Sequence, residues 1–199
     1  MLNHQKNILT RQRGVTLIEI LVVIIISSML IVIAALGIGA FFRKYKELSA
    51  WSVLQQEGLD CLNTIKNGIG VGNVPDVEYY GVINALKLQL TNTTTTTAQG
   101  LKITPPTEAG LETPDYAHFY FYDGAIRCRY VHHGIQAASP LYIFPKQESL
   151  GKIKVEKFQV TKVNPENDVL AVRVELKARI ETRKDEYKYI NYKTIMVKK

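Results

Sequence analysis

A long apolar run, residues 15–42, limits what this chain can fold into. The run contains one charged side chain, Glu19, and no proline. An unbroken helix of this length spans about 42 Å, whereas the hydrocarbon core of a bilayer is about 30 Å thick. The run is therefore long enough to cross a membrane, and it separates a short leader, residues 1–14, from a polar remainder.

The run does not fit an ordinary secretory signal, whose apolar core has about 7–15 residues and ends at a small-residue cleavage site. A plain membrane anchor fits its length, but the positive-inside rule does not decide its orientation, because basic residues lie on both sides: Lys6, Arg11 and Arg13 before it, and Arg43, Lys44 and Lys46 after it. A carboxylate within an apolar helix also costs about 2.5–3.5 kcal/mol on insertion scales. That cost falls if Glu19 meets a positive partner, such as the α-amino group made by a cut after Gly14.

The residues at this junction, Arg13-Gly14-Val15-Thr16-Leu17-Ile18-Glu19, resemble the prepilin cleavage and methylation site. Type IV pilins share this site with the pseudopilins of type II secretion and of related DNA-uptake systems. The resemblance implies cleavage between Gly14 and Val15 by a prepilin peptidase and N-methylation of Val15. It assigns Glu19 to pairing with a neighbouring subunit's terminus during assembly. Val15 departs from the pattern, which usually has phenylalanine at that position.

The resemblance also implies a location and a set of partners. The chain is expected to cross the inner (cytoplasmic) membrane once, with its C-terminal domain outside the cytoplasm, and then to enter a filament. The expected partners are the prepilin peptidase, an inner-membrane assembly platform and other pilin or pseudopilin subunits that pack through the N-terminal helix.

Residues 43–72 continue the helix as an amphipathic segment. Apolar residues recur there at three- and four-residue steps: Leu48, Trp51, Leu54, Cys61, Leu62, Ile65 and Ile69. We expect one helix from about Thr16 to Ile69, ended by Gly68, Gly70 and Gly72. Trp51 and Cys61 are expected in the core.

Residues 73–199 are predicted to form a β-rich domain. Alternating patterns predict antiparallel strands with one buried face: Ala117–Tyr122, Ala125–Val131, Leu141–Phe144, Lys154–Val163, Val169–Ile180 and Tyr187–Val197. Asp123-Gly124 predicts a hairpin turn. Residues 79–83 and 85–90 fit either short strands or a helix, and the Thr-rich segment 91–100 predicts an exposed loop by its composition.

The predicted fold class is therefore α+β, with a long N-terminal helix packed on a C-terminal antiparallel sheet. The pilin resemblance implies the same architecture. In size and shape the chain is most similar to a minor pseudopilin of the J type or a minor pilin of the W type.

Cys61 and Cys128 match neither a CxxC pattern nor zinc-ligand spacing. A disulfide between them and two separately buried thiols both remain open. Two other segments carry potential ligands, a histidine group near Cys128 and a turn of oxygen-bearing residues, but neither has the spacing of a metal site: His118, His132 and His133, and residues 164–168. We predict no metal and no cofactor.

The sequence contains no Gly-rich phosphate loop, GxSxG, HExxH or paired-carboxylate pattern. We therefore predict that the protein is not an enzyme and has no small-molecule substrate. The net charge is +7, but no dense Lys/Arg patch interleaved with aromatic residues appears along the chain. A tip subunit that binds DNA or a surface through the Thr-rich loop and the basic strands is the second hypothesis. A single-span anchored protein, uncut at Gly14, is the third.

Overall fold

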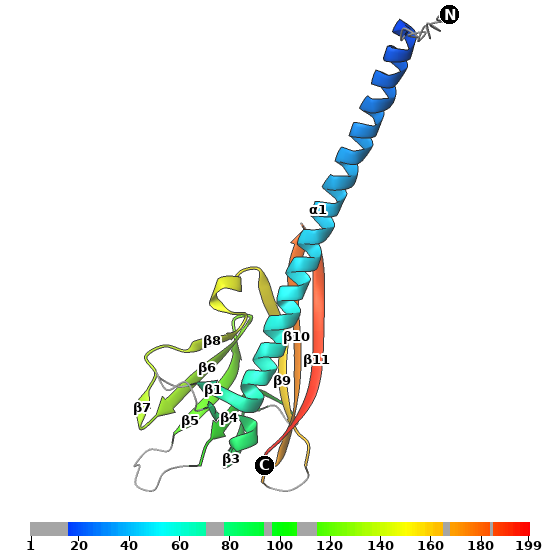
Figure 1. Ribbon diagram of the computed structural model, residues 1–199. Coiled ribbons are helices and arrows are strands. Elements are labelled where there is room, and N and C mark those ends of the chain that lie inside the picture. Colours follow the sequence, from blue (N-terminus) through cyan, green and yellow to red (C-terminus); the bar gives the residue numbers. More distant parts are fainter. Residues whose placement is uncertain (1–15, 71–77, 94–96, 107–114, 165–167, 184) are drawn as a thin grey trace, which may run out of the picture. The chain divides into compact units, whose positions relative to one another are not determined.

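The computed structural model describes residues 16–70, 78–93, 97–106, 115–164, 168–183 and 185–199. The chain divides into two compact units, Met1–Tyr45 and Lys46–Lys199. Helix α1, Leu17–Asn67, begins in the first unit and ends in the second (Figure 1).

In the first unit every described side chain, from Thr16 to Tyr45, is exposed. These side chains are almost all apolar, so the helix buries none of them within the chain itself. A helix satisfies its backbone hydrogen bonds internally, which is the condition for crossing a bilayer. By length and composition this part of α1 is able to span a membrane.

The C-terminal end of α1 lies two residues before the predicted one. Gly68 has a φ of +115°, a backbone conformation that favours glycine, and it ends the helix as predicted. Ile69 is not helical: Gly68–Gly70 form the short strand β1, which pairs antiparallel with β2, Glu78–Tyr80.

The described residues of the second unit form a nine-stranded antiparallel sheet. Its order is β11-β10-β9-β4-β5-β6-β7, with β3 paired to β4 and β8 paired to β6. The strands are β3 (Lys87–Thr93), β4 (Ala98–Thr104), β5 (Tyr116–Tyr122), β6 (Ala125–His132), β7 (Ile135–Gln136), β8 (Leu141–Phe144), β9 (Ile153–Lys162), β10 (Ala171–Arg183) and β11 (Glu186–Val197). Two 3₁₀ turns, η1 (Val82–Asn84) and η2 (Gln147–Ser149), complete the unit.

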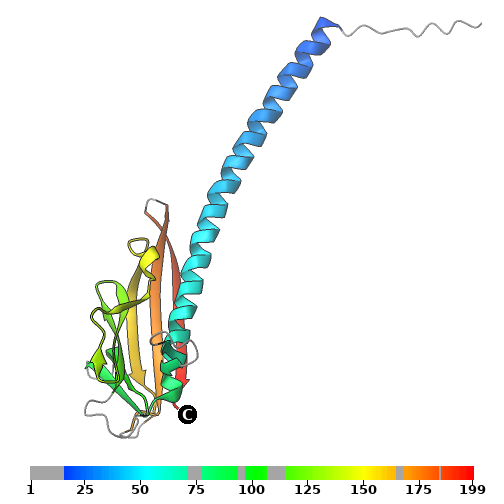
Figure 2. The same ribbon diagram turned by 60° about the vertical axis from the view of Figure 1, so that its left-hand side comes forward.

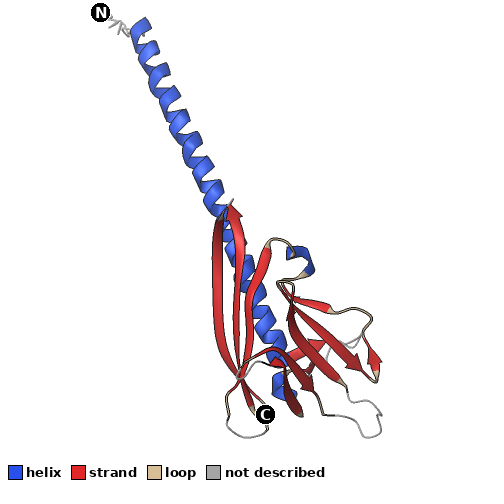
Figure 3. Ribbon diagram, turned by 180° about the vertical axis from the view of Figure 1, so that it is seen from behind, coloured by secondary structure: helices blue, strands red, loops and turns tan. Residues whose placement is uncertain are grey.

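The sheet consists of two groups of strands. The β9–β10–β11 meander touches the β3–β8 group through one residue pair, Ala98 and Val160. Figure 3 shows the two groups running at an angle to each other. The meander lies along the second half of α1 (Figure 2).

The strands predicted from alternation are confirmed, each to within about three residues at its ends. Asp123 and Gly124 join β5 to β6 with φ values of +48° and +70°, as a two-residue hairpin turn requires. The prediction was wrong at Val163, which is exposed because β9 ends at Lys162. A bulge opposite Lys177 and Ala178 explains why Val155 and Phe158 are both buried although they are three residues apart.

The Thr-rich segment is largely strand, so the prediction of a loop over residues 91–100 was wrong. Thr91–Thr93 belong to β3 and Ala98–Gly100 belong to β4, while residues 94–96 lie outside the described part. Threonine is β-branched and favours strands, a preference that outweighs the low-complexity appearance of the segment. The ambiguous residues 79–90 form the end of β2, then η1 and the start of β3.

The core of the second unit lies between α1 and the sheet. Leu54, Cys61 and Ile65 of the helix are fully buried. They join one cluster with the inner face of β10, which comprises Val172, Val174, Leu176, Ala178 and Ile180. The amphipathic half of the helix therefore covers the sheet, as predicted.

The prediction of Trp51 as a core residue was wrong, because its side chain is 37% exposed. The buried stripe runs through Glu47, Ala50 and Leu54. Trp51 lies one position away from this stripe, about 100° around the helix. The sequence analysis followed apolar residues and so missed that the first buried position is a glutamate.

Two buried glutamates attach α1 to the rest of the second unit. Glu47 lies 2.9 Å from Nζ of Lys188 and 3.8 Å from Arg183, at the hairpin end of β10 and β11. Glu57 accepts a hydrogen bond of 2.9 Å from the backbone N of Lys146 and another from the hydroxyl of Ser149. Both carboxylates thus have partners, which offsets the cost of burying them.

Gly81 lies where β2 crosses the end of α1. A Cβ at this position would overlap the carbonyl group of Asn67 and would lie 2.6 Å from the backbone N of Gly68. Because backbone atoms cannot rotate away, we expect Gly81→Ala to lower the free energy of unfolding by about 1–3 kcal/mol. Denaturant unfolding of the full chain in detergent measures this. Gly39→Ala is the control, since a Cβ there meets nothing within 4 Å, and an equal effect of the two variants would contradict the prediction.

Candidate functional site

The predicted cleavage and methylation residues, Gly14 and Val15, lie outside the described part of the chain. The candidate site is therefore described from Thr16, the residue just before helix α1. Glu19, the predicted assembly residue, is in the first turn of that helix.

Thr16 and Glu19 form a reciprocal cap at the start of α1. Oε2 of Glu19 accepts hydrogen bonds of 2.8 Å from the backbone N of Thr16 and 2.9 Å from its hydroxyl. The hydroxyl oxygen of Thr16 in turn accepts a 3.3 Å bond from the backbone N of Glu19. This is the capping box that the sequence pattern Thr-x-x-Glu specifies, and the pattern was not used in the sequence analysis.

The capping box gives Glu19 a local role. The sequence argument held that a plain anchor has no reason to carry a carboxylate at this position, but capping the first turn is such a reason. Glu19 alone therefore does not distinguish a plain anchor from a filament subunit. The distinction depends on the surrounding motif.

Helix α1 and the sheet define an α+β, pilin-like fold, with a long apolar N-terminal helix followed by a C-terminal antiparallel sheet. Residues 9–40 match the family model of the prokaryotic N-terminal methylation motif. This match supports a type IV pilin-like protein anchored in a membrane by its apolar helix. No curated protein and no solved structure matches the chain.

Cys61 and Cys128 are both buried and both free. The disulfide left open by the sequence is thus not formed, and the structure has the alternative of two buried thiols. Burial raises the pKa of the Cys128 thiol to about 12, which keeps it protonated and unreactive.

The histidines near Cys128 do not gather around it. Among the described residues, no three His, Cys, Asp or Glu side chains lie close enough together to hold a metal ion. The predicted oxygen-rich turn is only partly described, and its Asn164 closes the turn by accepting a 3.0 Å bond from the backbone N of Leu170.

A buried polar network surrounds Asp115, at the entry to β5. Its carboxylate accepts hydrogen bonds from the backbone N of His133 (3.0 Å), the backbone N of Gly134 (3.2 Å) and the hydroxyl of Tyr80 (3.2 Å). The Tyr80 hydroxyl also lies 2.7 Å from Nδ1 of His132. The network joins β2, the start of β5 and the β6–β7 turn, and the sequence analysis did not anticipate it.

Burial alone would raise the pKa of Asp115, but the hydrogen bonds from His133, Gly134 and Tyr80 and the nearby His132 outweigh it. The pKa of Asp115 therefore lies below its ordinary value. The ionised carboxylate stabilises the fold above that ordinary value, about 3.9, and this contribution is lost as the pH falls through the folded-state pKa.

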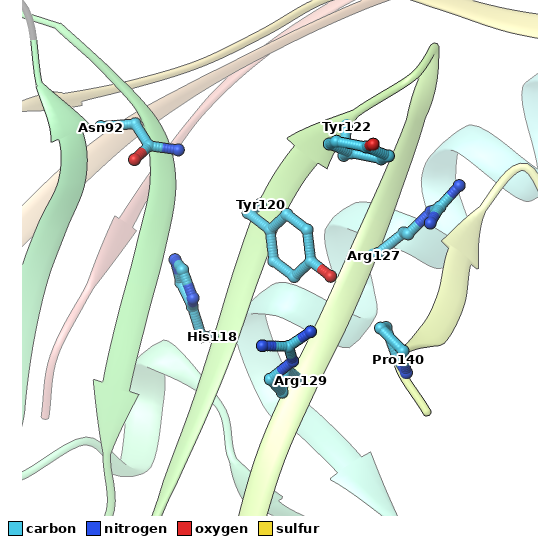
Figure 4. A pocket seen from close by; sticks show the side chains of 7 residues that line it. All are labelled: Asn92, His118, Tyr120, Tyr122, Arg127, Arg129 and Pro140. Carbon is cyan, nitrogen blue, oxygen red and sulfur yellow. The ribbon is translucent and has the colours of Figure 1, made fainter. Parts of the chain in front are cut away.

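A cleft of about 330 Å³ opens on the outer face of β5 and β6 (Figure 4). It is lined by Asn92, His118, Tyr120, Tyr122, Arg127, Arg129 and Pro140. Figure 4 shows His118, Tyr120 and Arg129 side by side, with Arg127 and Pro140 on the far side of the β5–β6 hairpin. The cleft contains aromatic rings and basic groups, and none of the described lining residues is acidic.

His118 is held on one side of the cleft by a neighbouring strand. Its Nε2 lies 2.8 Å from the hydroxyl of Thr91. The two side chains meet above Gly100, where a Cβ would overlap the Thr91 hydroxyl and lie 3.0 Å from Nε2. Burial, Lys102 and Arg129 together lower the pKa of His118, so its ring is neutral at pH 7.

We predict that Asp115→Asn lowers the free energy of unfolding at pH 7 by about 1–3 kcal/mol, because an amide cannot accept all of these hydrogen bonds as an anion does. The difference from the wild type should shrink as the pH approaches 3. Denaturant unfolding at a series of pH values measures this. Asp123→Asn, the same change on an exposed turn, is the control. A difference that stays constant with pH would contradict the assigned charge.

Proposed function

We propose that the protein is a minor pilin or pseudopilin, a structural subunit of a type IV pilus or of a type II secretion pseudopilus. The observation that carries this proposal is the methylation motif at residues 9–40, directly followed by a helix that continues into a β domain. The size of the C-terminal sheet favours a minor subunit of the J or W type. The proposed role is assembly, not catalysis.

In this proposal a prepilin peptidase cuts between Gly14 and Val15 on the cytoplasmic side, and the new N-terminus of Val15 is methylated. The apolar part of α1 crosses the inner membrane once and leaves the second unit outside the cytoplasm. An inner-membrane platform then moves the subunit into a filament, where Glu19 pairs with the α-amino group of a neighbour. The exposed apolar side chains of the first unit pass from lipid to other subunits, an exchange between two apolar environments.

Cleavage is tested on the full chain co-expressed with a prepilin peptidase. We expect the mass of a chain that starts at Val15 and carries one added methyl group. Gly14→Val should keep the full-length mass, because the motif needs the small residue before the cut. An unshortened wild-type chain would overturn the proposal and favour the plain anchor.

The role of Glu19 is tested by comparing two substitutions. Glutamine at this position keeps a capping oxygen for Thr16 but removes the negative charge, whereas alanine removes both. If Glu19 pairs with a terminal amine, Glu19→Gln and Glu19→Ala should both be cleaved and both fail to enter filaments, as measured by their amounts in sheared filament fractions. Normal incorporation of Glu19→Gln would show that capping suffices and would contradict the ion pair.

A second candidate function is a tip subunit that binds DNA or a surface. The cleft on β5 and β6 favours it, since that cleft combines basic and aromatic side chains. The basic C-terminal strands give less support, because their described lysines and arginines include many that are paired with Glu47, Glu156 or Glu175.

A further inference from the structure

The basic side chains around the cleft are held by aromatic rings instead of carboxylates. The guanidinium of Arg127 lies 4.9 Å from the ring centre of Tyr122 and 4.6 Å from that of Tyr142. Nζ of Lys102 lies 3.9 Å above the ring of Tyr116. A ring orients a cation without cancelling its charge. Among the described residues, neither side chain forms an ion pair with an acid, so the cleft keeps its positive potential.

The outer face of the β9–β10–β11 meander is built differently. There Lys157 and Lys193 lie 2.7 and 3.3 Å from Glu175, and Lys177 lies 2.7 Å from Glu156. Those cations are neutralised on the surface and have little charge to offer a ligand. The contrast between the two groups of strands assigns the free positive charge to the cleft.

The β5–β6 hairpin arranges rings and cations in successive rows. Tyr120 is opposite Arg127 in the strand register, and His118 is opposite Arg129. Residues two apart on a strand share a face and are about 6.7 Å apart. Each row therefore presents one ring and one guanidinium, and the pattern repeats along the strand.

Arg127 carries one more sign of an absent acceptor. Its Nε is buried and, among the described residues, has no hydrogen-bond partner. Such donors are rare in folded proteins and usually mark a site for water or a ligand. Tyr122, beside it, is 59% exposed and leaves ring surface open to solvent.

We propose that this cleft binds single-stranded nucleic acid. Phosphates would contact Arg127, Arg129 and Lys102, and bases would stack on Tyr120 and Tyr122. A basic groove with aromatic platforms is the chemistry that recognises an unpaired strand without reading its sequence. The cleft is of small-ligand size, so it admits unstacked bases and excludes a duplex. The inference concerns the second unit and does not depend on cleavage at Gly14.

The test uses the full chain in detergent and a short fluorescein-labelled oligothymidylate, with binding followed by fluorescence anisotropy at several salt concentrations. Removing two phosphate contacts in Arg127→Gln/Arg129→Gln should weaken binding at least about tenfold and reduce the salt slope by about 1.4. Arg129→Gln alone, at an exposed position, should reduce that slope by about 0.7. Tyr120→Leu should weaken binding about fivefold or more through lost stacking.

The matched control is Lys157→Gln/Lys193→Gln, which removes two positive charges from the meander and should leave binding unchanged. An equal loss in this control would show that net charge alone binds the probe and would overturn the site. Competition by polyglutamate, alginate or duplex DNA as strong as by unlabelled oligothymidylate would overturn the assignment to single strands. Absence of binding by the wild type would overturn the proposal, whereas processing at Gly14 by a prepilin peptidase should be the same in all of these variants.

Discussion

The packing of the second half of α1 against the sheet is the interaction on which the rest of the second unit depends. A sheet with one apolar face is not stable in water unless that face is covered. Leu54 and Ile65 are fully buried against it, and each such side chain contributes about 1.5–3 kcal/mol. The buried carboxylates of Glu47 and Glu57 then set the position of the helix along the sheet. A shift by one turn would leave both without their partners, at a cost of several kcal/mol.

The other end of the same helix carries no buried residues, and its only acid is used in the cap formed with Thr16. The backbone N of Thr16 is an amide hydrogen-bond donor whether or not the chain is cut after Gly14, so the cap is compatible with both forms. A neighbouring α-amino group would thus have to share or replace these bonds. Hydrogen bonds between two charged groups are roughly twice as strong as neutral ones, which gives a terminal amine that advantage in an apolar filament core.

The long helix, the strand positions and the covered sheet followed from periodicity, because each depends on local alternation of apolar and polar residues. The errors have identifiable physical causes. At Trp51 the apolar pattern was followed one position off the buried stripe, whose first member is Glu47. At residues 91–93 composition outweighed the strand preference of threonine. The network around Asp115 joins residues far apart in the chain and leaves no local pattern.

The cleft is a different case, because a local signal for it existed. A search for interleaved basic and aromatic residues along the chain fails, since the rings lie on β5 and the arginines on β6. The predicted turn at Asp123-Gly124 nevertheless sets which residues face each other: folding the chain there places Tyr120 opposite Arg127 and His118 opposite Arg129. Net charge could not reveal this arrangement, because it sums paired and unpaired cations alike. What distinguishes a binding surface from an ordinary basic strand is whether acids occupy the neighbouring positions, as Glu156 and Glu175 do on the meander.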